Sequence, residues 1–201
     1  MNPTVTLPLP ADPERRTWLL ATASAGGVAA VGAAAPLVAS LAPSERARSQ
    51  GAAVEVDLGD IPPGGLKAVE WRGKPVWILR RTPQMLAALD ALAPRLADPG
   101  SQRDAVPASL RNTARAARPE YLVVIGICTH LGCSPNFMPA GSAQAALGSD
   151  WPGGFFCPCH GSTFDLAGRV FRNKPAPTNL EIPPHRYLGE SRLLIGESEA
   201  A

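Results

Sequence analysis

The order of apolar and polar residues divides the chain into one long apolar stretch and a longer region of short apolar runs. No charged residue occurs from Trp18 to Leu41. A helix of that length is sufficient to cross a hydrocarbon core of about 30 Å. Residues 42–52, which follow, are small and polar, as is typical of a flexible tether. The pattern therefore predicts a transmembrane anchor over residues 17–41, the tether over 42–52 and a folded domain over 53–201.

Two arginines, Arg15 and Arg16, stand directly before the apolar stretch. Paired arginines followed by a weakly apolar segment are typical of a twin-arginine export signal. Positive charge also favours the cytoplasmic side of a membrane, so we expect residues 1–16 to lie in the cytoplasm. The alternative is a cleaved signal peptide, but the small residues near the end of the stretch run into Pro36 or Pro43, which disfavours cleavage there. We therefore expect the anchor to be retained.

The short apolar runs of the folded domain predict strands joined by turns. Valines alternate with acidic residues over 54–58, which is typical of a half-buried strand. The runs 66–71 and 75–79 are separated by a short polar stretch with a glycine and predict a hairpin. Thr82, followed by a proline, is expected to cap one short helix. Residues 121–127 form a continuous apolar run that suits a buried strand, and this strand leads directly to the first cysteine.

Composition supports a mainly β domain with many loops. The chain contains 22 prolines and 19 glycines, which favour short strands over long helices, and its 45% hydrophobic content is enough for a core. Residues 94–119 mix proline, charge and small side chains and are interpreted as a partly helical surface excursion. The formal net charge of +2, without a basic stripe, is not typical of nucleic-acid binding, and we expect no nucleic-acid partner.

All four cysteines fall in two short loops that also carry histidine and glycine: Cys128-Thr129-His130-Leu131-Gly132-Cys133 and Cys157-Pro158-Cys159-His160-Gly161-Ser162. Such loops can bind zinc, hold an iron–sulfur cluster through thiolates and imidazoles, or form a disulfide. Zinc modules prefer a Cys-x(2–4)-Cys unit and a His-x(3–5)-His unit. Here each loop instead gives one Cys-x-His or Cys-x-x-His unit and leaves a spare cysteine. The spacing therefore disfavours zinc and leaves the other two open.

The two loops, CTHLGC and CPCHGS, resemble the paired signature of Rieske iron–sulfur proteins. The stretches VEVDLGDIPPGGLKAVEWRGKPVWILRRT and KPAPTNLEIP, with the anchor and tether, further resemble the Rieske subunit of proteobacterial ubiquinol–cytochrome c reductases. The resemblance covers nearly the whole chain and is weakest over residues 94–119 and at the C-terminus. It implies an N-terminal transmembrane helix, an antiparallel β Rieske domain with one or two short helices, and a cluster-binding subdomain over about 126–178.

The resemblance also implies the cofactor and its ligands. One [2Fe–2S] cluster is expected, with thiolates on one iron and imidazoles on the other, held by Cys128, His130, Cys157 and His160. The remaining cysteines, Cys133 and Cys159, are then expected to form a disulfide between the loops. Since disulfides persist in oxidising compartments, the domain is expected in the periplasm, on a single-pass anchor in the bacterial inner membrane.

Further residues take roles by the same resemblance. His160 is expected to contact quinol and to couple electron uptake to a proton, while Leu131 shields the cluster and seats the quinone. Ser162 is expected to donate its hydroxyl to a bridging sulfide. Phe164 stands where high-potential relatives have a tyrosine that donates to a ligand sulfur, which predicts a lower potential here. His185 matches no ligand position and is interpreted as a surface histidine.

Cytochrome b, a c-type cytochrome and quinol are the expected partners, in a dimeric complex. The expected activity is that of an electron-transfer subunit of quinol–cytochrome c reductase. One alternative is the Rieske subunit of a periplasmic enzyme such as arsenite oxidase. A second is a ferredoxin-type Rieske protein that serves an oxygenase, which the two extra cysteines disfavour.

Overall fold

The computed structural model describes two separate units. The described residues are 13–44, 51–142 and 147–198. The chain divides into Met1–Arg48 and Ser49–Ala201, and each unit is considered by itself.

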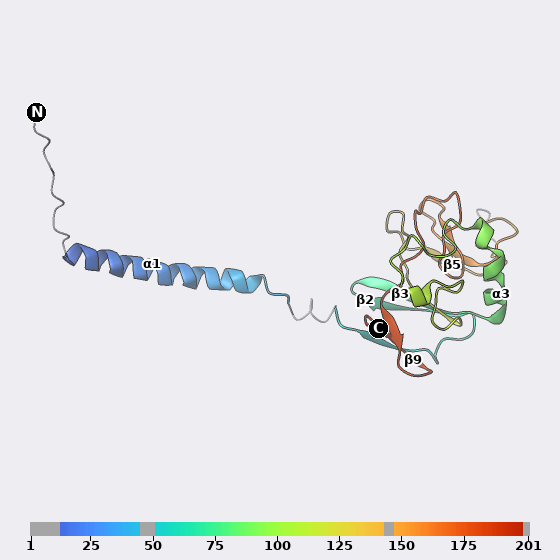
Figure 1. Ribbon diagram of the computed structural model, residues 1–201, viewed down its shortest axis with the longest axis horizontal. Helices are drawn as coiled ribbons and strands as arrows, with labels where there is room; N and C mark the ends of the chain where they lie inside the picture. Colours follow the sequence, from blue (N-terminus) through green and yellow to red (C-terminus); the bar gives the residue numbers. More distant parts are fainter. Residues whose placement is uncertain (1–12, 45–50, 143–146, 199–201) are drawn as a thin grey trace, which may run out of the picture. The chain divides into compact units, whose positions relative to one another are not determined.

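The first unit contains one helix, α1, Pro13–Ser40 (Figure 1). Its 28 residues would be roughly 42 Å long. By length and composition it is the one helix of the described residues that is long and apolar enough to cross a membrane. Arg15 and Arg16 lie in its first turns. The predictions for residues 1–12 and 45–50 fall outside the described part of the chain.

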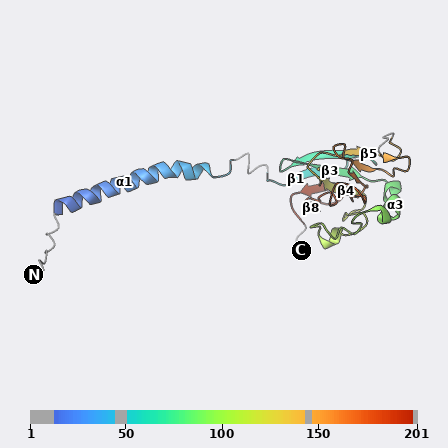
Figure 2. The same cartoon turned by 90° about the horizontal axis from the view of Figure 1, so that it is seen from above.

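The second unit consists of three small antiparallel sheets and a short helix (Figures 1 and 2). The sheet orders are β1-β9-β8, β2-β3-β4 and β5-β6-β7. The bounds are β1 Val54–Asp57, β2 Leu66–Trp71, β3 Lys74–Arg80, α3 Pro83–Ala91, η1 Ala93–Arg95, η2 Ala108–Leu110, β4 Tyr121–Ile125, β5 Asn136–Met138, β6 Gly154–Phe156, β7 Thr163–Phe164, β8 His185–Tyr187 and β9 Arg192–Ile195. The expected mainly β architecture with one or two short helices is confirmed.

The sheet β2-β3-β4 lies between two hydrophobic cores. In β3, Val76 and Ile78 belong to the core shared with β1 and β9, whereas Trp77 and Leu79 belong to the core shared with β6 and β7. This division follows from the alternation of side chains along a strand. Both faces of the sheet are therefore buried, which explains why β3 and β4 read as continuous apolar runs. Figure 1 shows β9 on one side of this sheet and β5 on the other.

The predicted hairpin and helix start are confirmed at the residues that specify them. Arg72 and Gly73 both have positive φ, 51° and 71°, which is the conformation of a two-residue turn that matches strand twist. The Thr82 hydroxyl accepts a hydrogen bond from the Met85 N–H at 3.3 Å and caps α3.

Residues 94–119 are in part the expected surface segment, since many of them are exposed and η1 and η2 give it partial helicity, but the segment also contributes buried side chains. Leu96, Ser101 and Arg115 are almost completely buried. Leu96 bridges to Phe171, and Arg115 reaches beneath the loops that follow β7. The prediction of a surface excursion is therefore only partly correct, because polar side chains of a short segment can be buried when they hydrogen-bond to distant backbone.

Candidate metal centre

The first cysteine loop begins where β4 ends. The Cys128 N–H donates to the Cys133 carbonyl at 2.7 Å, and the Gly132 N–H donates back to the Cys128 carbonyl at 3.1 Å. Gly132 has φ +84°, a conformation that glycine adopts without steric cost. The turn therefore presents the intervening Thr129, His130 and Leu131 at its tip.

The second loop repeats this backbone pattern between β6 and β7. The Cys157 N–H donates to the Ser162 carbonyl at 2.8 Å, and the Gly161 N–H donates to the Cys157 carbonyl at 3.0 Å. Gly161 has φ +75°. Each loop thus places a cysteine at its base and a glycine with positive φ four residues later, and the histidine stands between them.

The four expected ligand side chains form two pairs, one of cysteines and one of histidines. Cys128 and Cys157 are free, buried thiols in mutual contact. The imidazole centroids of His130 and His160 are 4.7 Å apart with nearly perpendicular rings. His130 is half-buried and His160 is exposed. The arrangement, with two thiols inside and two imidazoles toward solvent, fits the mixed sulfur and nitrogen donor set of a Rieske cluster.

Cys133 and Cys159 form the predicted disulfide, with Cα atoms 6.7 Å apart. It joins the tips of the two loops across 26 residues of sequence. The Cys157 sulfur lies within 4.8 Å of both disulfide sulfurs. Since the thiolate is the metal-binding form of cysteine, the disulfide leaves Cys128 and Cys157 as the two cysteines that could bind a metal here.

A third loop, around Pro175-Ala176-Pro177, is hydrogen-bonded to both ligand loops. The Ala176 N–H donates to the Ser162 hydroxyl at 3.0 Å. The Thr129 hydroxyl donates to the Thr178 carbonyl at 2.7 Å. Sequence reasoning missed Thr129 and Thr178, because neither residue type signals such a contact from its position in the chain.

Burial raises the pKa of the Cys128 thiol. The His130 backbone N–H and the Ser162 hydroxyl oppose this rise by donating hydrogen bonds to the sulfur, and the neighbouring Cys157 reinforces it. The thiol is therefore poised to be neutral without a cation, and a bound metal ion would deprotonate it. This chemistry fits a metal site.

The remaining expected residues divide into exposed and buried ones. Leu131 is 71% exposed at the tip of the first loop, beside His130. Phe164 is fully buried and pairs with Phe155 across β6 and β7. Leu131 is therefore accessible to another molecule, whereas Phe164 can act only from within the domain.

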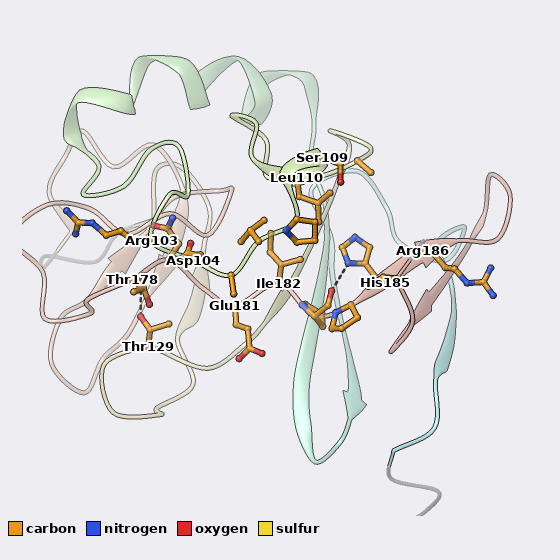
Figure 3. A pocket seen from close by; sticks show the side chains of 18 of the residues that line it. Arg103, Asp104, Ser109, Leu110, Thr129, Thr178, Glu181, Ile182, His185 and Arg186 are labelled. Carbon is orange, nitrogen blue, oxygen red and sulfur yellow. Dashed lines mark hydrogen bonds between the residues drawn. The ribbon is translucent and has the colours of Figure 1, made fainter. Parts of the chain in front are cut away.

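A cavity of about 740 Å³ lies beside this centre and contains none of the four expected ligands. Thr129 and Thr178 form one end of it, and His185 lines another part (Figure 3). The His185 Nδ1 lies 2.8 Å from the Pro183 carbonyl, and its ring packs near Tyr187. His185 is thus half-buried, so the expectation of a surface histidine is corrected.

Comparisons with known proteins agree with this geometry. A family model described as Rieske [2Fe-2S] domain matches residues 105–184. The chain is 54% identical over 187 residues to the ubiquinol-cytochrome c reductase iron-sulfur subunit of Allochromatium vinosum, covering 93% of this chain and 90% of that one. It is 42% identical over 190 residues to the mitochondrial cytochrome b-c1 complex subunit Rieske-1 of Arabidopsis thaliana, of which it spans 62%.

A solved structure, of a hyperthermophilic respiratory Complex III, matches with a TM-score of 0.50 and 25% identity over 87% of this chain and 97% of that one. Fold and site together thus define a Rieske [2Fe–2S] protein, and the cofactor is a Rieske-type cluster. Within that class, the chain belongs to the family of ubiquinol–cytochrome c reductase iron–sulfur subunits.

Proposed function

We propose that this chain is the electron-transfer subunit of a respiratory quinol–cytochrome c oxidoreductase, with cytochrome b and a c-type cytochrome as partners. The observation that carries the proposal is the exposed His160 imidazole, packed against His130 in two loops that also hold two buried free thiols, in a chain 54% identical to such a subunit over nearly its full length. The relatives' names favour this function over that of an arsenite oxidase subunit.

In the proposed site, Cys128 and Cys157 bind one iron and His130 and His160 bind the other. When bound, the cluster supplies a one-electron carrier whose potential is raised by its imidazole ligands. The burial of the thiols excludes water from the sulfur side. Ser162 orients its hydroxyl between Cys128 and the third loop.

The exposed imidazole of His160 handles the proton. One ring nitrogen would hold the iron, and the other would be placed to accept a hydrogen bond from the quinol hydroxyl and to take up its proton. Leu131 offers an exposed apolar surface for the quinone ring. Because Leu131 and His160 come from different ligand loops, the disulfide that joins those loops also keeps the quinol contact together.

We further propose that residues 17–41, which comprise most of α1, are a retained single-pass anchor in the bacterial inner membrane. A cytoplasmic twin-arginine segment (residues 1–16), which includes the first residues of α1, precedes the anchor, and the 42–52 tether follows it. The Rieske domain, residues 53–201, lies in the periplasm, where the disulfide persists, and the assembled complex is a dimer. Carbonate extraction of membranes tests the anchor: the protein should remain in the pellet, and its release would contradict retention.

Histidine variants test the function in membranes of a strain with this chain as its only Rieske subunit. We expect His160→Gln to abolish inhibitor-sensitive quinol–cytochrome c reductase activity. His185→Gln is the matched control, since His185 is the histidine outside the proposed site. The reduced wild-type protein should give a Rieske-type paramagnetic resonance signal that changes when a quinol-site inhibitor is added. A signal that does not change when the inhibitor is added would favour the alternative that this chain is the Rieske subunit of a different periplasmic enzyme.

A further inference from the structure

The turn Asp165–Arg169, which directly follows β7, is held by arginines through its backbone. The Leu166 carbonyl accepts a hydrogen bond from Arg81 at 3.1 Å. The Ala167 and Gly168 carbonyls accept from Arg115 at 3.0 and 3.3 Å. The three successive carbonyls of Leu166, Ala167 and Gly168 thus each accept a hydrogen bond from a buried guanidinium of a distant segment.

Arg115 connects this turn to a second segment. Its Nη2 donates to the Leu180 carbonyl at 2.8 Å and lies 3.2 Å from the Asp104 carboxylate. Its side chain is completely buried. A guanidinium is planar and offers several donors in a fixed fork, so one side chain can fix two backbone segments relative to each other.

The two segments lead to different ligand loops. The turn joins through β7 to Ser162 and the second loop. Leu180 lies two residues after Thr178, whose carbonyl accepts from Thr129 in the first loop. The Leu180 N–H also donates to the Gly168 carbonyl at 2.8 Å, so the segments are adjacent where Arg115 bridges them.

Burying this guanidinium is costly for the protein. Burial lowers the pKa of Arg115 to about 10, and Asp104 and Asp165 partly oppose the shift. Its Nε is one of the buried polar atoms without a hydrogen-bond partner among the described residues. A buried charge is weak evidence for stability, because a well-packed apolar side chain often serves stability as well. A role in geometry explains its presence better.

We propose that Arg115 is a positioning residue for the cluster: by bridging the 165–169 turn and Leu180, it sets the separation of the two ligand loops. The inference rests on the ligand set proposed above. It also gives a function to the 94–119 segment, which supplies both Arg115 and its partner Asp104.

The test compares Arg115→Met with Arg111→Met in the full-length, cluster-loaded protein. Arg111 is the matched control, because its guanidinium donates to the Val106 carbonyl within the same segment and contacts no carbonyl of the turn. The readouts are the g-values of the reduced cluster, its midpoint potential and the half-life of the cluster on warming.

We expect Arg115→Met to shift the g-values and the potential and to shorten the cluster half-life at least tenfold. The substitution removes all three carbonyl contacts of the guanidinium, and the loss of a single charged hydrogen bond already corresponds to roughly that factor. Arg111→Met should match wild type. A lower melting temperature with unchanged g-values and potential would show a merely structural role and overturn the proposal.

If Arg115→Met does not fold, the positioning role is tested with Arg115→Lys and Asp104→Asn instead. Lysine keeps the charge but lacks the planar fork, and Asp104→Asn weakens the orientation of Arg115, so both should alter the g-values. Wild-type g-values in both variants would overturn the positioning role. A wild-type protein without a mixed sulfur and nitrogen signature would instead overturn the ligand set.

Discussion

Replacement of Ser162 by alanine tests how the cluster environment is built. Ser162 is fully buried. Its hydroxyl accepts a hydrogen bond from the Ala176 N–H at 3.0 Å, and as a donor beside Cys128 it lowers the pKa of that thiol. The substitution removes a donor to the proposed ligand sulfur and also leaves a buried N–H without a partner.

The size of each effect follows from these two contacts. An unsatisfied buried N–H costs about 1–3 kcal/mol, which should lower the free energy of unfolding by that amount. A hydrogen bond to a charged sulfur favours the more negative, reduced state. If the free energy of this hydrogen bond is about 1–2 kcal/mol more favourable in the reduced state than in the oxidised state, its loss in Ser162→Ala should lower the midpoint potential by roughly 40–90 mV for a one-electron couple.

Redox titration followed by paramagnetic resonance measures the potential, and thermal unfolding measures the stability. Ser142→Ala is the control, because that hydroxyl donates to the Pro139 carbonyl at 2.6 Å, away from the ligand loops. The control should leave the potential unchanged. An unchanged or raised potential in Ser162→Ala would refute the reasoning, even if the protein became less stable.

Three further variants test separate features of the domain. Phe164→Tyr, at a buried position, should raise the midpoint potential in a redox titration by adding a donor; a midpoint that stays or falls contradicts this. Replacing both Cys133 and Cys159 by serine should lower the free energy of unfolding, measured with denaturant, by about 2–4 kcal/mol and should shorten the half-life of the cluster. A cluster half-life equal to that of wild type would show that the disulfide does not stabilise the cluster. Asp165→Asn should destabilise the domain by about 3–5 kcal/mol in thermal melts, because it leaves the buried Arg169 guanidinium unpaired; a melt like wild type would refute the importance of this pair.

Local features of the site could be predicted from the sequence. The hairpin depends on Arg72-Gly73 and the helix start on Thr82, and both specify structure within a few residues. The ligand loops carry cysteine, histidine and glycine in short motifs, which indicate a metal site, a disulfide or both, and the family resemblance adds which residues take which role. The disulfide followed from family resemblance and is present.

The contacts that position the ligand loops could not be predicted in this way. Arg115 reaches carbonyls 52 and 65 residues away. Any residue can supply a backbone carbonyl, so such partners leave no signal in the sequence. For the same reason the mixture of proline, charge and small side chains in residues 94–119 suggested a surface segment, although Leu96 and Arg115 are buried.

The central claim is that two of the three histidines, His130 and His160, ligate the cluster. Pulsed paramagnetic resonance of the reduced protein labelled with ¹⁵N-histidine tests it directly. We expect two strongly coupled histidine nitrogens, both unchanged in the His185→Asn variant. A spectrum without strong histidine couplings, or the loss of one coupling in His185→Asn, would contradict the ligand assignment.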